Sequence, residues 1–243
     1  MMTKPVRLGM LTPSSNTVLE PVTTAMLAAL PEASAHFSRF RALEISLDAR
    51  SQDQFALDAM MGAARLLAEA RVTAICWNGA SAGWLGIDRD RSLCQTIQKE
   101  TGVPATSSVL ALLEAFKLAG VKRYGLVTPY VRDVQQRILD NFKAEGFECV
   151  ADRFLSITDN FAFSEVSEAR LEATIREVAR GGPQAIVVLC TNLRAAPVVD
   201  LLERDIGIPV YDTIATAVWG SLRLAKVDPK RVQGWGRIFR DLA

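Results

Sequence analysis

Two cysteines stand where short hydrophobic segments end. Cys76 and Cys190 each close a run of β-branched and apolar residues, and small or polar residues follow both. A thiol placed before a helix N-terminus has a lowered pKa, which raises its fraction of reactive thiolate. The segment after Cys76, WNGASAG, allows backbone amides to approach an anion closely, and Asn78, Ser81 and Thr191 add polar side chains. We therefore predict that Cys76 and Cys190 are catalytic and that a carboxylate binds beside them.

Other chemistries have little support in the sequence. Cys94 and Cys149 have no partner at a matching position, and we interpret them as structural, which is the usual role of a buried free cysteine. His36 is the one histidine, the four cysteines form no C-x-x-C pair, and neither G-x-G-x-x-G nor G-x-x-x-x-G-K-[ST] occurs. We expect no metal and no organic cofactor.

The composition is that of a folded, soluble enzyme rather than a charged binding module. Of 243 residues, 49% are hydrophobic and 23% are charged, and the formal net charge is +1. That charge provides no field for holding a polyanion, so nucleic acid is not an expected partner. The N-terminal apolar stretch is too short for a signal peptide or a membrane span, and we expect a cytoplasmic protein with free thiols and no membrane partner.

Apolar runs alternate with segments of helical period, which predicts an α/β fold with a parallel sheet flanked by helices. The sequence also repeats itself. RLGMLTP at 7–13 returns as RYGLVTP at 123–129, AICWN at 74–78 as VLCTN at 188–192, and GVP at 102–104 as GIP at 207–209. The expected strands are 7–12, 72–77, 124–128 and 185–190, and the expected helices are 17–30, 54–70, 107–118, 131–145, 168–180 and 197–205.

This order of matches predicts two pseudo-symmetric α/β lobes that face each other across a cleft. The first lobe would comprise 1–106 together with 214–243, and the second would comprise 107–213. Ligands bind beyond the carboxyl ends of parallel strands, where all these motifs lie. If the lobes are related by a pseudo-twofold axis, Cys76 and Cys190 should meet at the cleft.

Five motifs together resemble the aspartate/glutamate racemase superfamily. They are TPSSNT at 12–17, CWNGAS at 76–81, VTPY at 127–130, DNF at 159–161 and CTNLRA at 190–195. They most resemble its maleate cis-trans isomerase branch, and arylmalonate decarboxylase is a neighbouring branch. The resemblance covers nearly the whole chain and implies two lobes with the active site between them, no metal or organic cofactor, and a homodimer.

In that branch, the resemblance implies, Cys76 would add as a thiolate to the alkene of maleate and Cys190 would exchange a proton at the adjacent carbon. Asn16 would bind a substrate carboxylate, helped by Tyr130 and Asn160. Rotation about the resulting single bond and expulsion of the thiolate would give fumarate. Trp77 is bulkier than the small or aliphatic residue usual at its position, so it would narrow or reshape the pocket.

Three alternatives stay open. A racemase would use two thiols as acid and base on opposite faces of one carbon. An arylmalonate-type decarboxylase usually keeps a cysteine at the position of Cys190 and none at that of Cys76, so the presence of both favours isomerisation or racemisation. A two-lobed protein that only binds a carboxylate would have the same architecture without catalysis.

Overall fold

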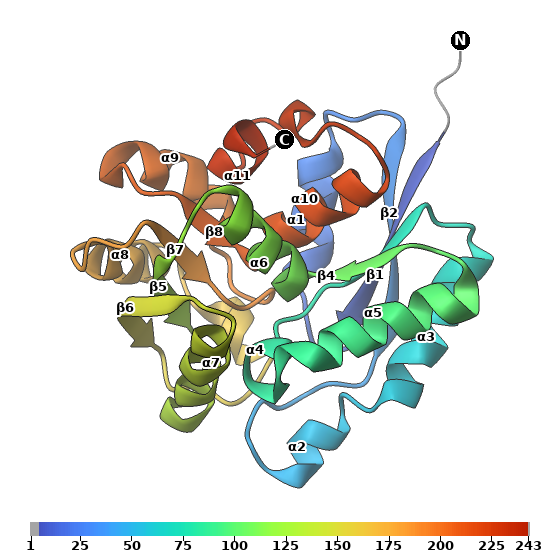
Figure 1. The fold of residues 1–243 in the computed structure, drawn as a ribbon, viewed down its shortest axis with the longest axis horizontal. Coiled ribbons are helices and arrows are strands. Elements are labelled where there is room, and N and C mark those ends of the chain that lie inside the picture. The colour runs from blue at the N-terminus through green and yellow to red at the C-terminus, as the bar shows by residue number, and fades with distance from the viewer. Residues whose placement is uncertain (1–4, 243) are drawn as a thin grey trace.

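Two parallel four-stranded sheets form the framework of residues 5–242, the part of the chain that this computed structural model describes. The strand order is β2-β1-β3-β4 in the first sheet and β6-β5-β7-β8 in the second (Figure 1). Their bounds are β1 (Val6–Pro13), β2 (Ala33–Phe40), β3 (Ala74–Trp77), β4 (Ala105–Ser107), β5 (Arg123–Thr128), β6 (Glu148–Phe154), β7 (Ala185–Val188) and β8 (Val210–Asp212).

Helices connect the strands, because parallel neighbours need a crossover connection. The central strands β3 and β7 are buried along their whole length, which is why they read as uninterrupted apolar runs. The helices are α1 (Leu19–Leu27), α2 (Ala49–Asp53), α3 (Leu57–Glu69), α4 (Ala82–Leu85), α5 (Ile87–Thr101), α6 (Ser108–Leu118), α7 (Arg132–Ala144), α8 (Glu168–Ala179), α9 (Ala196–Ile206), α10 (Thr213–Leu224) and α11 (Arg237–Asp241), with 3-10 turns η1 (Ala162–Glu165) and η2 (Pro229–Arg231).

The two sheets repeat one pattern, which confirms the predicted two-lobed α/β fold. Gly102 and Gly207 end α5 and α9 in the same left-handed conformation, with φ of 71° and 72°. Ser107 and Asp212 then end the fourth strand of each sheet, and each side chain caps the helix that follows. The same local chemistry therefore terminates equivalent elements in both halves.

Strand ends differ from the expectation at the two cysteines. The predicted strand 185–190 ends at Val188, so Cys190 lies two residues beyond β7. Cys76 instead lies inside β3, which runs on to Trp77. The two thiols therefore occupy different places relative to their strands.

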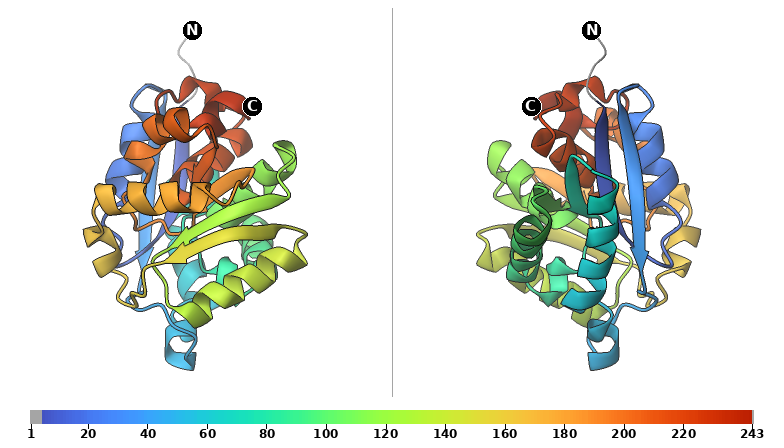
Figure 2. Two further views of the ribbon diagram at one scale, coloured as in Figure 1. Left: turned by 90° about the vertical axis from the view of Figure 1, so that its left-hand side faces the viewer. Right: turned by 90° about the vertical axis from the view of Figure 1, so that its right-hand side faces the viewer.

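Helix α10 joins the two halves. It follows β8 of the second sheet, but it packs against α6, β4, β3 and α1 of the first. In Figure 2 the strands of the first sheet run across the direction of those in the second. The carboxyl ends of the central strands thus approach one another from two directions, which prepares a site between the halves.

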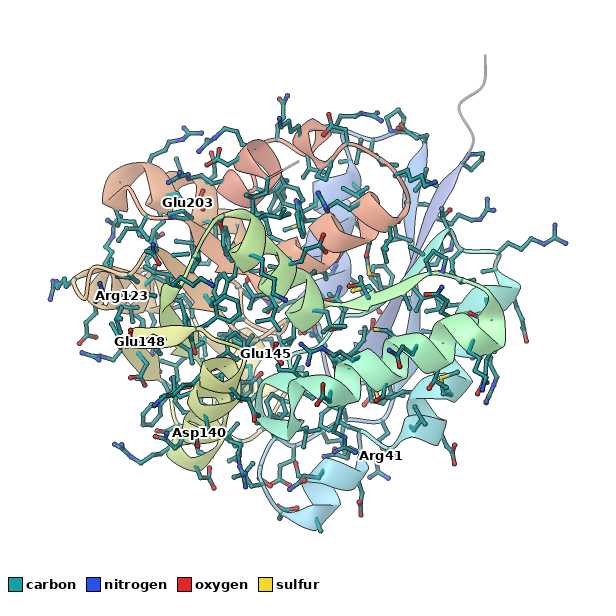
Figure 3. The ribbon with its side chains drawn as sticks, viewed as in Figure 1. Arg41, Arg123, Asp140, Glu145, Glu148 and Glu203 are labelled. Atoms are coloured by element: carbon teal, nitrogen blue, oxygen red, sulfur yellow. The ribbon has the colours of Figure 1, made fainter. Side chains whose placement is uncertain are left out.

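A buried carboxylate fixes the C-terminal segment to the second sheet. Glu203 of α9 accepts hydrogen bonds from the backbone N–H groups of Val210 and Arg237, both at 2.7 Å (Figure 3). Burial raises the pKa of its carboxyl group to about 7, although both amides act in the opposite direction. Glu203 therefore links α9, β8 and the start of α11.

This pKa predicts a pH-dependent stability. The folded chain holds the Glu203 proton more tightly than the unfolded chain, where the group titrates near 4.5, so its contribution is complete below that pH and is lost as pH rises through 7. The free energy of unfolding should fall by more than ~1 kcal/mol between about pH 5 and pH 8, measured by urea denaturation. Glu203→Gln should reduce this slope, and the exposed Glu165→Gln should not. An unchanged slope in Glu203→Gln would contradict the assignment.

Candidate active site

A closed cavity lies beyond the carboxyl ends of the central strands. Its volume is about 20 Å³, which is room for about one water molecule. Both halves of the chain contribute to its wall. The lining residues are Pro13, Ala42, Ile45, Phe55, Trp77, Gly79, Ala80, Ser81, Trp84, Tyr130, Asn160, Cys190 and Thr191.

Of the described residues that line this cavity, Cys190 is the one with a thiol. The backbone N–H of Asn192 donates a hydrogen bond to its Sγ at 3.4 Å, and the Tyr130 hydroxyl is a second hydrogen-bond partner. Burial nevertheless raises the pKa of the Cys190 thiol to about 12. In this closed state the group is a protonated thiol with two donors ready to stabilise a thiolate.

Polar side chains connect the two halves directly behind the wall. Asn16 Nδ2 donates to the backbone oxygen of Thr191 at 3.0 Å and to its hydroxyl at 3.1 Å. The Thr191 hydroxyl donates in turn to the backbone oxygen of Asn78 at 3.2 Å. Asn16 Oδ1 also accepts hydrogen bonds from the first amides of α1, at Val18 and Leu19. All these bonds are buried, so they hold Thr191 in one position.

The predicted carboxylate-binding residues separate into two groups. Tyr130, Asn160 and Thr191 line the cavity, and Asn160 Nδ2 donates to the Ser15 hydroxyl at 2.8 Å. Asn16 and Asn78 are absent from the lining. Both are buried behind it, where their groups act on Thr191 or on neighbouring backbone.

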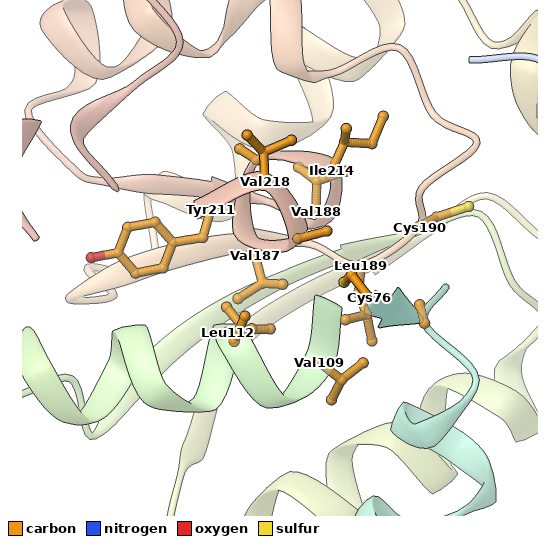
Figure 4. Packing of buried hydrophobic residues seen from close by; sticks show 14 of the residues in the cluster. Cys76, Val109, Leu112, Val187, Val188, Leu189, Cys190, Tyr211, Ile214 and Val218 are labelled. Carbon is orange, nitrogen blue, oxygen red and sulfur yellow. The ribbon is translucent and has the colours of Figure 1, made fainter. Parts of the chain in front are cut away.

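The structure does not bring Cys76 to this cavity. Its side chain is fully buried (0% exposed) in the hydrophobic core and has Ser221 of α10 as a hydrogen-bond partner. Burial raises the pKa of this thiol well above its usual range. Figure 4 draws Cys76 within the apolar cluster, whereas the Cys190 sulfur points away from the labelled valine and leucine side chains. A catalytic role for Cys76 stays a prediction without support from the cavity.

Strand register corrects the expected equivalence of the two cysteines. In the first sheet Met10 pairs with Cys76, and in the second sheet Leu126, which takes the place of Met10, pairs with Val187. Cys76 thus corresponds to Val187, three positions before Cys190. Counting on from these pairs, the counterpart of Cys190 is Gly79.

Hydrogen bonds after the strands give the same correspondence. The backbone N–H of Asn78 donates to Leu11 O at 3.1 Å, and that of Leu189 donates to Val127 O at 2.9 Å. Asn78 and Leu189 are therefore equivalent, and the next residues, Gly79 and Cys190, both line the cavity. A glycine and a cysteine, not two cysteines, occupy the matching positions.

Sequence reasoning missed the part of the wall contributed by Ala42, Ile45 and Phe55. These residues follow β2, so the rule that sites lie beyond strand ends would have found them, had it been applied to this strand. Phe55 packs against Trp77 and Trp84, with ring centroids 6.2 and 6.1 Å apart. The missed residues therefore give the cavity its aromatic side.

Within residues 5–242, no group of three His, Cys, Asp or Glu side chains is arranged to hold a metal ion. None of the helices in that range is both long enough and apolar enough to cross a membrane. The chemistry of the cavity wall is that of one thiol, several neutral hydrogen-bond donors and aromatic rings.

Comparisons with known proteins agree with this architecture over the whole chain. A maleate isomerase from Alcaligenes faecalis is 29% identical over 238 residues, covering 92% of this chain and 91% of the relative. An arylmalonate decarboxylase from Bordetella bronchiseptica is 26% identical, covering 75% of this chain and 78% of the relative. The crystal structure of the maleate isomerase Iso from Pseudomonas putida superposes with a TM-score of 0.87 at 25% identity, covering 98% of this chain and 99% of that chain.

The family comparison is equally extensive. The sequence model described as arylmalonate decarboxylase matches residues 9–239, which includes every strand and all the residues that line the cavity. By that match, the chain belongs to the arylmalonate decarboxylase family.

Proposed function

We propose that this chain is a cofactor-independent isomerase that converts maleate to fumarate, with Cys190 as the reacting thiol. The position of Cys190 on the cavity wall, with hydrogen-bond partners on its sulfur, carries the proposal. The similarity to maleate isomerases along the full chain supports it. A structure of the Nocardia farcinica maleate cis-trans isomerase, 25% identical, contains a covalently bound succinylcysteine intermediate, so a thiol adds to the substrate in that relative.

One thiol is sufficient for this reaction. The Cys190 thiolate adds to one alkene carbon of maleate, and the π electrons move through the other alkene carbon into its carboxylate, which becomes an enediolate. The former double bond is now a single bond and rotates. When the electrons return, the carbon–sulfur bond breaks and fumarate leaves with the thiolate regenerated. The proton lost from Cys190 at the start returns to it at rest, so the step balances without a cofactor.

Ionisation of Cys190 is the demanding step. The pKa of about 12 in the closed cavity results chiefly from burial. A cavity of about 20 Å³ cannot contain a four-carbon dicarboxylate, so it must widen when substrate enters. Widening admits water and lowers the cost of the thiolate, which the Asn192 amide and the Tyr130 hydroxyl then stabilise.

Two sets of residues have different roles in this proposal. Tyr130, Asn160 and Thr191 line the cavity and bind the substrate carboxylates, and they stabilise the enediolate by hydrogen bonding. Asn16 and Asn78 act through Thr191 and are positioning residues, because their bonds to it fix its hydroxyl and backbone. Both sets come from the prediction made from the sequence, and they now differ by location.

Decarboxylation of a substituted malonate is a second candidate, favoured by the single thiol opposite Gly79 and by its protonated state. Loss of carbon dioxide leaves the bonding electrons on the remaining carboxylate as an enediolate. The Cys190 thiol then gives its proton to the adjacent carbon and recovers one from water. This reaction uses the thiol as an acid, whereas isomerisation uses the thiolate as a nucleophile.

The cysteines predict a sharp difference between variants. Cys190→Ala should reduce kcat for maleate by about 1,000-fold or more, because it removes the reacting atom. Cys76→Ala should keep kcat within about tenfold, since its sulfur lies in the core. The matched control is Cys94→Ala, another buried cysteine away from the cavity. Equal losses in Cys76→Ala and Cys190→Ala, with folding verified by circular dichroism, would contradict the one-thiol site.

The reaction itself can be identified by proton NMR in heavy water with maleate and phenylmalonate as separate substrates. The proposal predicts that the maleate alkene signal converts to that of fumarate without solvent deuterium in the product, because no carbon is protonated in the scheme. Turnover of phenylmalonate alone, with one deuterium at the carbon next to the carboxylate, would replace the isomerase by the second candidate. Turnover of neither substrate would remove both.

A further inference from the structure

Trp77 presents a hydrogen-bond donor that nothing in the protein uses. It is the last residue of β3, it is 1% exposed, and it lines the cavity. Side chains alternate along a strand, so Trp77 points to the opposite face from Cys76. Its ring packs against Phe40, with centroids 5.2 Å apart, and against Phe55. Among the described residues, no acceptor lies within hydrogen-bond range of its Nε1.

A buried indole N–H without a partner is unusual, because leaving such a donor unpaired costs free energy. The other fully buried tryptophan, Trp219, follows the rule: its Nε1 donates to the backbone oxygen of Leu242 at 2.7 Å. The two residues differ in surroundings, since Trp77 lines the cavity and Trp219 does not. An acceptor that enters the cavity would satisfy the free donor.

The nitrogen-bearing edge of the indole lies against Gly79. A Cβ atom placed on residue 79 would lie 2.2 Å from Cζ2 of Trp77 and 2.8 Å from Cε2, the ring carbon bonded to Nε1. These distances are shorter than any normal contact, so the ring fills the space of a side chain at this position. Gly79 is the counterpart of Cys190, as the strand register shows. Trp77 therefore covers the place that a second thiol would need.

We propose that the Trp77 indole N–H donates a hydrogen bond to a carboxylate oxygen of the bound substrate, and that its ring leaves Cys190 as the one reacting group, acting from a single face. This inference rests on the proposed function for the identity of the substrate, but the donor role requires only that a small carboxylate binds. It adds Trp77 and Gly79 to the residues that determine specificity.

The cavity makes such a donor important. Among the described residues that line it, none is charged. Negative charge that builds up on the enediolate must therefore be stabilised by neutral donors fixed in place, and such groups are effective where water is excluded. Trp77 is fixed by its packing against Phe40 and Phe55, so its N–H needs no reorganisation when charge develops. Loss of one preorganised donor of this kind typically costs about 100-fold in rate.

Kinetics provide the first test. Trp77→Phe retains an aromatic ring but removes the N–H, and kcat/KM should fall by about 100-fold, mostly through kcat. Trp219→Phe removes a buried indole N–H outside the cavity and should keep kcat/KM within about threefold. If Trp77→Phe retained full kcat/KM, the donor role would be wrong.

A binding measurement separates this inference from the proposed function. In nitrogen-15 NMR spectra of the whole protein, succinate, an unreactive dicarboxylate, should move one indole signal downfield, and that signal should be the one missing from Trp77→Phe. This shift without turnover of maleate or phenylmalonate would retain the donor and reject the proposed function. A Trp77 signal that does not move with saturating succinate or malonate would overturn the inference.

The steric part predicts coupling between the two positions. Gly79→Ala should lower the melting temperature by several degrees, because its Cβ displaces the Trp77 ring. In a Trp77→Leu background the same change should cost less than half as much, since the obstructing ring atoms are gone. Equal decreases in both backgrounds would show that Trp77 does not occupy the space over Gly79.

Discussion

The alternation of side chains along β3 determines which chemistry this site can perform. Because consecutive residues of a strand face opposite ways, the core receives Cys76 and the cavity receives Trp77. A shift of one residue in register would exchange them and would produce two thiols at the cavity. The pairing of Met10 with Cys76 and of Leu11 with Trp77 fixes the register and therefore leaves Cys190 as the thiol of the site.

Polar contacts between the halves then position that thiol. Asn16 caps α1 with its oxygen and binds Thr191 with its nitrogen, so one side chain connects a helix start in the first half to the residue next to Cys190. Thr191 extends the connection to the backbone of Asn78, which precedes Gly79. The two matching loops are thereby tied to each other, and the cavity between them is small and preorganised.

The sequence predicted most of the framework. The duplication, the α/β class and the central strands could be identified because buried parallel strands read as apolar runs, and because repeated glycine and proline punctuation marks equivalent ends. Tyr130, Asn160, Thr191 and Cys190 were correctly placed near one another, since all follow strands. These features depend on local chemistry that a single sequence displays.

The error at Cys76 has a physical cause. The match of AICWN to VLCTN aligns residue types, but hydrogen bonding aligns Cys76 with Val187, and a pattern of apolar letters cannot show where within it the strand ends. The role of Trp77 was equally hidden, because it depends on a ring lying across Gly79 and on an N–H without an acceptor. Both are properties of three-dimensional packing.

The central claim, one reactive thiol at residue 190, can be tested by locating a covalent adduct. But-2-ynedioate has the two carboxylates of the proposed substrate, and a thiolate adds to its triple bond irreversibly. After brief labelling and trypsin digestion, peptide mass spectrometry should find the adduct on the peptide 181–194, which contains Cys190, and succinate should protect it. An adduct on the peptide 72–89, which contains Cys76, or none on 181–194, would contradict the account.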